Sequence, residues 1–262
     1  MIFRRKKHHL KTLATRYLKN RGHHVIHESQ FRSDFPEEFW KLWKRIREYT
    51  LTSPERGLGL YMALNYLEAN SLAGDVVECG VYKGGSSMLA ALSLLQNRDM
   101  HETHSSMEEF RHLWLYDTFQ GMPVPGKQDR VAYTNEPVSR RWKSGWWEAS
   151  EQEVRKRMDQ TGYPVDKIHV IAGDVRETLV QHKPESIALL RLDTDWYAST
   201  KAELEHLYPL LVPGGVLIVD DYGHFTGARQ AVDEYFAQLG YAPLLNRLDY
   251  TGRIMVKPGP GQ

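Results

Sequence analysis

Between residues 75 and 240, short apolar runs alternate with longer stretches in which apolar residues recur at helical spacing. The apolar runs are DVVECG, LWLYD, IHVIAGD, IALLRLD and GVLIVDD, which begin at residues 75, 113, 168, 187 and 215. Consecutive apolar positions of this kind are typical of parallel strands that are covered on both faces. Helices are predicted between and after them, over residues 84–96, 150–162, 199–211 and 226–240. The alternation predicts an α/β fold with a Rossmann-like, doubly wound sheet.

Two more helices are predicted before the first strand, and a hairpin after the last helix. Residues 36–50 begin with a proline and carry Phe, Trp and Leu at helical spacing. Residues 52–70 begin with Thr52 and Ser53, either of which can cap a helix that has a proline at its first position. Residues 246–258 read as two short strands joined by a turn.

The pattern divides the chain into an N-terminal arm, residues 1–34, and a single domain, residues 35–262. Within that domain we expect a helical cap over residues 35–72. The arm is locally basic, with no acidic residue before Glu28. It is expected to be a solvated extension, a contact to a polyanion or membrane surface, or an oligomer contact, and the sequence leaves these alternatives open.

Composition narrows the class of protein. A net charge of +1 over 262 residues gives no general attraction to nucleic acid. The single cysteine excludes an internal disulfide framework and is typical of a reducing compartment. No apolar run approaches the roughly 20 residues of a membrane span, and the basic N-terminus lacks the apolar stretch of a secretory signal. We therefore expect a cytoplasmic protein with no stable membrane insertion.

Acidic residues or glycines follow every predicted strand. In open α/β sheets, ligands bind beyond the carboxyl ends of the strands, so these residues are the first candidates for a site. In chain order they are Glu78 and Gly80, Asp117 and Thr118, Gly173 and Asp174, Asp193 and Asp195, and Asp220 and Asp221.

The loop ECGVYKGGSS after the first strand favours S-adenosylmethionine. Its glycine spacing differs from the dinucleotide pattern, and Asp117 follows Gly80 by 37 positions (117 − 80), against about 20 in a nicotinamide site. We expect Asp117 to accept hydrogen bonds from both ribose hydroxyls, and Asp174 to lie on the adenine side. The helix that starts after the loop offers free N–H groups to an anion.

Carboxylates at the ends of the fourth and fifth strands predict a cation site. If these strands are neighbours, Asp193, Asp220 and Asp221 converge, and three hard oxygen ligands suit Mg²⁺. The alternative is that Asp220 caps the turn and Asp221 is solvated. Asp195 is expected to be a loop or helix-entry residue, before a helix capped by Ser199 or Thr200.

Several motifs together resemble the macrocin O-methyltransferase family. They are VVECGVYKGGSS, LYDTFQGMP, GDVRETL, LLRLDTDWYASTKAELEHLYPLLVPGGVLIVDDYG and GARQAVDEYF, in the family's order from about Thr52 to Phe236. The resemblance implies a class I S-adenosylmethionine-dependent methyltransferase fold with an N-terminal helical extension. It also implies a Mg²⁺-assisted O-methyltransferase that acts on a sugar hydroxyl of a glycosylated natural product or saccharide, and a homo-oligomer.

The same resemblance implies roles for individual residues. Asp193 is implied as both metal ligand and general base, with Asp220 and Asp221 completing the metal site; His224 is a competing base. The residues implied for the cofactor are Thr52, Ser53, Glu78, Gly80, Tyr82, Ser86, Asp117, Thr118 and Asp174.

Two stretches match nothing in the resemblance: residues 1–25 and residues 127–150. The second falls where a lid or acceptor-binding insertion is expected, over residues 124–150. Its Trp142, Trp146 and Trp147 suit stacking on a sugar face, the core of a lid, or an oligomer contact.

Two other functions compete with methyl transfer. The Asp193-Thr194-Asp195 motif could hold the metal of a nucleotide-sugar glycosyltransferase, although that leaves Asp220, Asp221 and the first loop without a role. A non-catalytic binding module has no need of three converging carboxylates.

Overall fold

A computed structural model describes residues 14–15, 17–18, 20–21, 33–100 and 110–259. The predicted basic arm lies largely outside the described residues. The chain divides into two compact units, Met1–Trp40 and Lys41–Gln262. Helix α3 (Glu37–Ile46) and a 3-10 turn (Arg47–Tyr49) lie where the first helix was predicted. The boundary after residue 34 and the extent of the cap stay predictions.

The second unit is built on a seven-stranded sheet in the described part of the chain, in the order β3-β2-β1-β4-β5-β7-β6. The parallel strands are β1 (Asp75–Cys79), β2 (Leu113–Asp117), β3 (Ile168–Ala172), β4 (Ile187–Leu192) and β5 (Leu211–Val219). The antiparallel strands β6 (Asn246–Arg247) and β7 (Arg253–Val256) form the predicted hairpin. The five apolar runs, the hairpin and the Rossmann-like fold class are thus confirmed.

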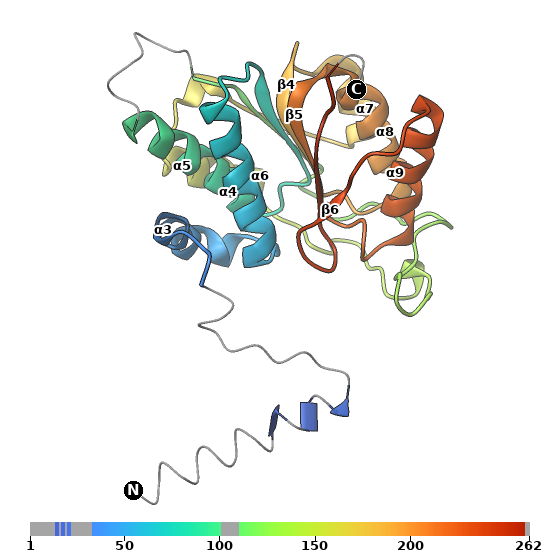
Figure 1. Ribbon diagram of the computed structural model, residues 1–262. Helices are drawn as coiled ribbons and strands as arrows, with labels where there is room; N and C mark the ends of the chain where they lie inside the picture. Colours follow the sequence, from blue (N-terminus) through green and yellow to red (C-terminus); the bar gives the residue numbers. More distant parts are fainter. Residues whose placement is uncertain (1–13, 16, 19, 22–32, 101–109, 260–262) are drawn as a thin grey trace, which may run out of the picture. The chain divides into compact units, whose positions relative to one another are not determined.

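Helices cover both faces of this sheet (Figure 1). One layer holds α4 (Pro54–Ala69), α5 (Gly85–Met100) and α6 (Glu151–Asp159); the other holds α7 (Val175–Gln181), α8 (Tyr197–Leu207) and α9 (Thr226–Leu239). Short 3-10 turns cover Val138–Arg140, Val165–Lys167 and Tyr208–Leu210. All six residues of β4 are buried, which explains why its sequence is apolar except for Arg191.

Two helix starts test the capping predictions. Ser53 caps α4, since its Oγ accepts a hydrogen bond from the backbone N–H of Arg56 at 3.2 Å, and Pro54 takes the first helical position. The prediction for α8 was wrong: the helix begins at Tyr197, before Ser199. Ser199 instead donates a hydrogen bond back to the carbonyl oxygens of Thr194 and Trp196, which shortens the loop after β4.

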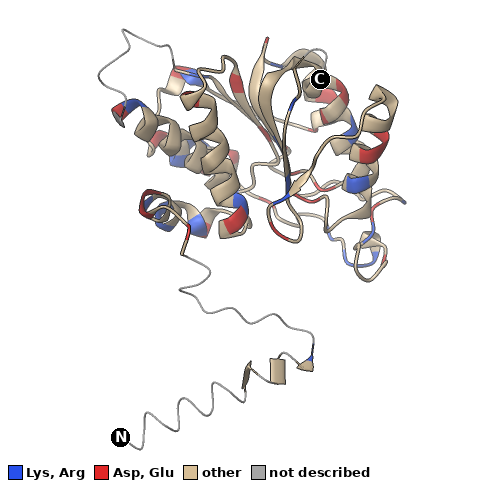
Figure 2. Ribbon diagram, in the orientation of Figure 1, with Lys and Arg blue, Asp and Glu red and all other residues tan. Residues whose placement is uncertain are grey.

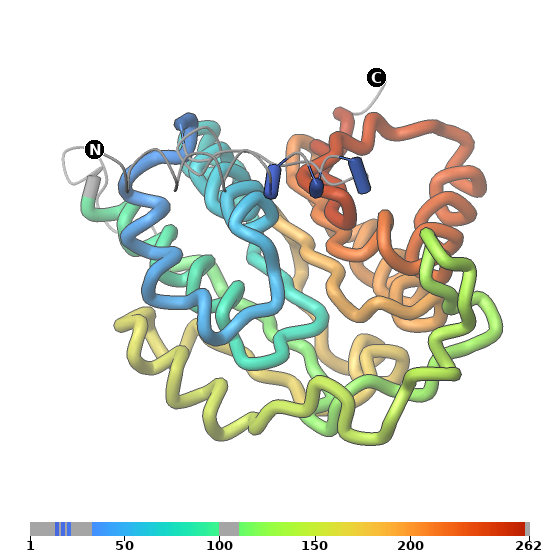
Figure 3. Tube along the Cα trace, turned by 90° about the horizontal axis from the view of Figure 1, so that it is seen from below, coloured from blue at the N-terminus to red at the C-terminus, as the bar shows by residue number. Residues whose placement is uncertain are grey.

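The segment after β2 runs along the carboxyl edge of the sheet to the start of α9, drawn in green beside the red C-terminal part in Figure 3. Val131 pairs with Phe225, and the Ala132 N–H donates to the carbonyl oxygen of His224 at 2.8 Å. A small apolar cluster beneath it contains Val131, Val138, Trp196, Phe225 and Ala228, with Met122, Trp142, Trp146 and Trp147 packed against it. The insertion is therefore an ordered part of the domain.

Charges of both signs are interspersed over the helices in the view of Figure 2, in keeping with the net charge of +1. Among the described residues, none of the helices combines the length and the apolar character that crossing a bilayer requires.

Candidate active site

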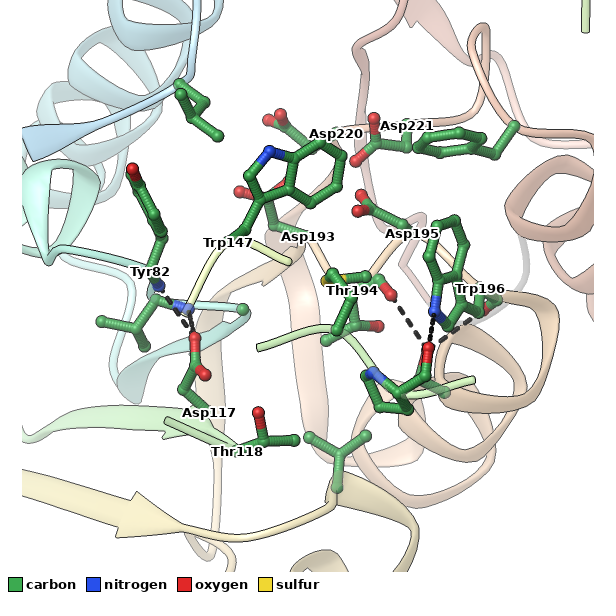
Figure 4. Close-up of a pocket in the computed structure, with 18 of the residues that line it drawn as sticks. Tyr82, Asp117, Thr118, Trp147, Asp193, Thr194, Asp195, Trp196, Asp220 and Asp221 are labelled. Carbon is green, nitrogen blue, oxygen red and sulfur yellow. Dashed lines mark hydrogen bonds between the residues drawn. The ribbon is translucent and has the colours of Figure 1, made fainter. Parts of the chain in front are cut away.

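The carboxyl ends of the parallel strands surround a cavity of about 250 Å³ (Figure 4). Tyr82 and Asp117 lie on one side of it, and Asp193, Asp195 and Asp221 on the other. The residues after β1, β2, β3, β4 and β5 all contribute to its lining. Residues that were selected from sequence because they follow the strands therefore line one cavity.

Three aspartates form a cluster in this cavity. Carboxylate oxygens of Asp193, Asp195 and Asp221 all lie within 4.8 Å of one another. Burial and the charges of Asp220 and Asp221 raise the pKa of Asp193 well above its usual range, against the lowering effect of Arg191. Burial and the charges of Asp193 and Asp220 raise the pKa of Asp195 to about 7, against a hydrogen bond with Asp221 that lowers it.

The cluster fits a divalent cation. Its donors are carboxylate oxygens, which Mg²⁺ prefers, and opposite ligands of an octahedral Mg²⁺ lie about 4.2 Å apart, close to the spread of the cluster. Burial is the main cause of the raised pKa values of these carboxylates, and their mutual repulsion when ionised adds to it. A cation bound here would remove that repulsion.

Asp220 has different partners from those expected. It is almost fully buried, and its Oδ1 accepts a hydrogen bond from Nη2 of Arg191 at 2.7 Å. Its Oδ2 accepts one from Nη1 of Arg56. Because both oxygens face arginines, the structure groups Asp195, and not Asp220, with Asp193 and Asp221. The structure thus adds Asp195 to the carboxylates expected at the cation site and sets Asp220 apart from them, and the ligand set stays a prediction.

Arg191, in β4, is the buried hub of the site. Its guanidinium contacts Glu78 at 2.5 Å, Asp193 at 2.8 Å and Asp220 at 2.7 Å. Its Nη2 also donates a hydrogen bond to Oγ1 of Thr52 at 2.7 Å. Burial alone would lower the pKa of Arg191, but the charges of the three carboxylates raise it well above its ordinary value. Arg191 was not among the residues predicted from sequence, although a charged side chain inside an apolar strand is a recognisable signal of a functional or structural role.

The loop after β1 is held in shape by Asp117. Oδ2 of Asp117 accepts hydrogen bonds from the N–H groups of Val81 and Tyr82, both at 2.8 Å, and Oδ1 accepts one from Phe119 at 2.8 Å. A carboxylate accepts about four hydrogen bonds, so one position remains for a ligand. Binding of both ribose hydroxyls by Asp117 would need one more acceptor position than these bonds leave, and a ribose contact of Asp117 stays a prediction.

Gly80 serves the packing of the loop as well as the cavity that it lines. It has a φ of +89°, and a Cβ there would lie 2.0 Å from the carbonyl oxygen of Asp193. Only glycine fits between the ends of β1 and β4 in this conformation.

Most of the predicted cofactor residues line the cavity. They are Thr52, Gly80, Tyr82, Ser86, Asp117, Thr118 and Asp174. Ser53 does not, because its hydroxyl caps α4 and donates to Asp249 at 2.8 Å. Glu78 does not either; it is buried beneath the loop against Arg191 and Ser87. These two residues shape the cavity from outside.

Asp174 caps α7 and is already paired. Its side chain accepts hydrogen bonds from the backbone and guanidinium of Arg176, at 2.6 to 2.9 Å. These bonds from Arg176 lower the pKa of Asp174. Arg176 also lines the cavity, so the part of the cavity at Asp174 presents an ion pair and not a lone carboxylate.

His224 lines the cavity at the start of α9. Its Nδ1 lies 2.6 Å from the hydroxyl of Tyr250. Burial, with the nearby charge of Arg56, lowers the pKa of His224, so its ring is neutral at pH 7.

A buried acid behind the aspartate loop went unnoticed in the sequence. Glu203 of α8 is fully buried, and its Oε1 accepts a hydrogen bond from Oγ1 of Thr194 at 2.7 Å. Within the described chain, its Oε2 has no hydrogen-bond partner. Burial raises the pKa of Glu203 to about 8. A helical glutamate gives no sequence signal of this kind, because most of them face solvent.

Comparisons with known proteins indicate the family of the chain. The sequence model of the macrocin O-methyltransferase (TylF) family matches residues 3–257, which include the arm and the tryptophan-rich insertion that the sequence analysis left unmatched. A tetracenomycin rhamnosyl 4'-O-methyltransferase of Streptomyces olivaceus is 29% identical over 204 residues, 78% of this chain and 74% of that one. Demethyldecarbamoylnovobiocin O-methyltransferase of Streptomyces niveus is 32% identical over 183 residues, 70% and 66% of the two chains.

Solved structures give the same result. The O-methyltransferase NovP superposes with a TM-score of 0.69 at 29% identity, covering 80% of this chain and 83% of its own. A calicheamicin methyltransferase has a TM-score of 0.58 at 20% identity, over 88% and 94% of the two chains, and shows the shared class I methyltransferase fold. The match to the family model over residues 3–257 decides against the glycosyltransferase and the non-catalytic module. The chain belongs to the macrocin O-methyltransferase family.

Proposed function

We propose that this protein is an S-adenosylmethionine-dependent, Mg²⁺-assisted O-methyltransferase that acts on a sugar hydroxyl of a glycosylated natural product or saccharide. The observation that carries the proposal is the aspartate cluster, Asp193, Asp195 and Asp221, in one cavity with the loop after β1. The relatives' names, which specify sugar and antibiotic O-methylation, support the substrate class.

The cofactor would lie between the ends of β1, β2 and β3. Tyr82 and Ser86 line the cavity next to α5, and Thr52 contributes to the same lining. Asp117 has one acceptor position left for a ribose hydroxyl, and the Asp174–Arg176 pair lies at the adenine end. S-adenosylmethionine supplies the methyl group, carried on a sulfonium.

Asp193 and Asp221 would hold the cation, and Asp195 would take the proton. Arg191 fixes Oδ2 of Asp193 at 2.8 Å, which orients that carboxylate as a ligand. Asp195, like Asp221, has no ion pair with an arginine among the described residues, so its carboxylate is not fixed in the way that Asp193 is. Its φ of +66° is uncommon outside glycine, and such backbone conformations cluster at functional sites. The contacts therefore favour Asp195 over Asp193 as the base.

In the proposed reaction, the cavity orients the acceptor so that one hydroxyl faces Asp195. A divalent cation at the cluster supplies positive charge, which lowers the pKa of a nearby hydroxyl. Asp195 receives the hydroxyl proton on a carboxylate oxygen, and the oxygen attacks the methyl carbon as the carbon–sulfur bond breaks. Arg56 and Arg191 form ion pairs with Asp220 behind the cluster. Positioning supplies much of the rate, since the three reacting atoms must be in line.

Two measurements test this function. Isothermal titration calorimetry should detect binding of S-adenosylhomocysteine, and mass spectrometry should detect methyl transfer from labelled S-adenosylmethionine in the presence of Mg²⁺. We name two acceptor probes: methyl α-L-rhamnopyranoside and demethyldecarbamoylnovobiocin. Full transfer in excess chelator would contradict the role of the cation, and absence of S-adenosylhomocysteine binding would contradict the cofactor. The expected homo-oligomer is checked by light scattering.

A further inference from the structure

Trp147 has a backbone conformation that bulky residues rarely adopt. Its φ is +59°, in the left-handed region that favours glycine. It follows Gly145, whose φ is +74°, in a turn closed by a hydrogen bond from the N–H of Glu148 to the carbonyl oxygen of Gly145 at 3.1 Å. A tryptophan in such a position must be held there by its surroundings.

The loop after β2 holds this turn in place. The N–H of Met122 donates to the carbonyl oxygen of Trp146 at 2.8 Å, and Nε1 of Trp142 donates to the carbonyl oxygen of Met122 at 2.9 Å. Gly121 packs so closely that a Cβ would lie 2.7 Å from the Trp146 carbonyl oxygen. The turn is therefore locked to a loop that starts directly after Thr118, at the edge of the cavity.

The three tryptophans of the insertion have different surroundings. All three pack against the small apolar cluster, but Trp147 also lines the cavity, whereas Trp142 and Trp146 do not. The rings of Trp146 and Trp147 stack with centroids 4.4 Å apart and planes inclined by 30°. Trp146 thus supports one face of Trp147. Among the described residues, none accepts a hydrogen bond from Nε1 of Trp147, unlike Nε1 of Trp142 and Trp196.

The position of Trp147 in the cavity points to the acceptor. In the view of Figure 4 its indole lies between Tyr82, on the cofactor side, and Asp221, on the cluster side. An acceptor must place one hydroxyl at Asp195 and the rest of its ring against the remaining wall. That wall is apolar, with Met122, Pro123, Trp147, Trp196 and Phe225 among its residues. Trp196 and Phe225 are almost completely buried, so Trp147 offers the accessible ring.

We propose that Trp147 is the platform on which the acceptor sugar ring stacks, and that it determines acceptor affinity. This inference rests on the proposed function. A sugar ring presents C–H groups on one face, and a flat, apolar indole matches that face. The left-handed turn then has a purpose, because it brings the indole of Trp147 to the cavity while the half-buried Trp146 packs against the small apolar cluster. A free Nε1–H remains to donate to a sugar oxygen.

Three variants test the proposal. Trp147→Ala should raise the KM for the acceptor probe that the wild-type protein methylates by about tenfold. Trp147→Phe keeps an aromatic ring, so its KM for that probe should stay within about threefold of the wild-type value. Tyr133→Ala is the matched control, since Tyr133 belongs to the same insertion, is 72% exposed and does not line the cavity. S-adenosylhomocysteine affinity, measured by calorimetry, should be unchanged in all three.

The outcomes separate this proposal from the function on which it rests. An unchanged acceptor KM in Trp147→Ala would overturn it. So would a loss of S-adenosylhomocysteine affinity, which would place the indole on the cofactor, or a change in oligomeric state with intact acceptor binding. Wild-type protein that neither methylates nor binds either probe would overturn the proposed function together with the inference. Circular dichroism and the melting temperature of each variant exclude loss of the fold as the cause.

Discussion

Arg191 and Asp193 stand two residues apart at the end of β4, and their side chains form an ion pair of 2.8 Å. The same guanidinium contacts Glu78 from β1 and Asp220 from the end of β5. One buried arginine therefore joins the ends of three neighbouring strands. It pairs with Glu78 beneath the loop after β1 and with Asp193 in the aspartate cluster, so the geometry of both depends on a single side chain.

Arg191→Met should destabilise the fold. The substitution leaves buried carboxylates without a partner, which costs on the order of 3–5 kcal/mol. Arg191→Lys keeps the charge, but a single ammonium group cannot reach all the partners that Nη1 and Nη2 of Arg191 contact. We therefore expect a smaller loss of folding free energy than in Arg191→Met, and a large loss of kcat. Denaturant unfolding and methyl transfer assays measure the two effects. Arg155→Met is the control: its ion pair with Glu151 is half exposed, and its loss should cost under about 1 kcal/mol. Equal effects at Arg155 and Arg191 would contradict the hub role.

Three aspartate variants distinguish the expected ligand set from the observed cluster. Asp193→Asn should lose both Mg²⁺ affinity and methyl transfer, and Asp195→Asn should lose transfer with a smaller loss of Mg²⁺ affinity. Asp220→Asn should retain Mg²⁺ binding and lower the stability, because its oxygens are bound by Arg56 and Arg191. Calorimetric titration of Mg²⁺ into each variant measures the difference. If Asp220→Asn abolished Mg²⁺ binding and Asp195→Asn left it intact, the set expected from sequence would be restored.

The sheet could be predicted from the sequence because its signal is local. Each parallel strand is a continuous apolar run, and the carboxyl ends of such strands must meet at one edge. The position of the cavity followed directly. The identity of its residues did not, because Asp193, Asp195, Asp220 and Asp221 look alike in sequence. Which of them faces an arginine depends on Arg56, 164 positions away from Asp220.

The insertion shows a second limit of sequence reasoning. Trp142, Trp146 and Trp147 are equivalent in composition, and their roles separate only through backbone conformation. A left-handed tryptophan has no sequence signature, since glycine is the residue that predicts such a turn. Here Gly145 marks the turn, and the unusual position falls two residues later.

Asp117→Ala should weaken cofactor binding through the loop after β1. The variant removes the three hydrogen bonds that the Asp117 carboxylate accepts from the N–H groups of Val81, Tyr82 and Phe119. It also removes the one acceptor position left for a ligand. We expect S-adenosylhomocysteine affinity to fall by about tenfold or more, equivalent to at least 1.4 kcal/mol. Asp75→Ala is the matched control, because Asp75 also accepts two hydrogen bonds, from His112 and Trp114, at the opposite end of β1. It should lower the melting temperature and leave that affinity unchanged; equal losses in both variants would indicate general destabilisation.

Glu203 should make the stability of the protein depend on pH. Its pKa is raised from an ordinary 4.5 to about 8 in the folded state, chiefly by burial. Between these two values the unfolded chain binds fewer protons than the folded one, so stability falls as pH rises, by up to about 1.4 kcal/mol per pH unit. Glu203→Gln is close in shape to the neutral acid and cannot ionise. It should therefore gain stability relative to wild type as pH rises from 5 to 8, and the gain should level off above pH 8. Denaturant unfolding at pH 5, 6, 7 and 8 measures this difference, with Glu205→Gln, an exposed neighbour on α8, as the control. A difference between Glu203→Gln and wild type that did not change with pH would show that Glu203 is ionised in the fold, with a partner other than Thr194.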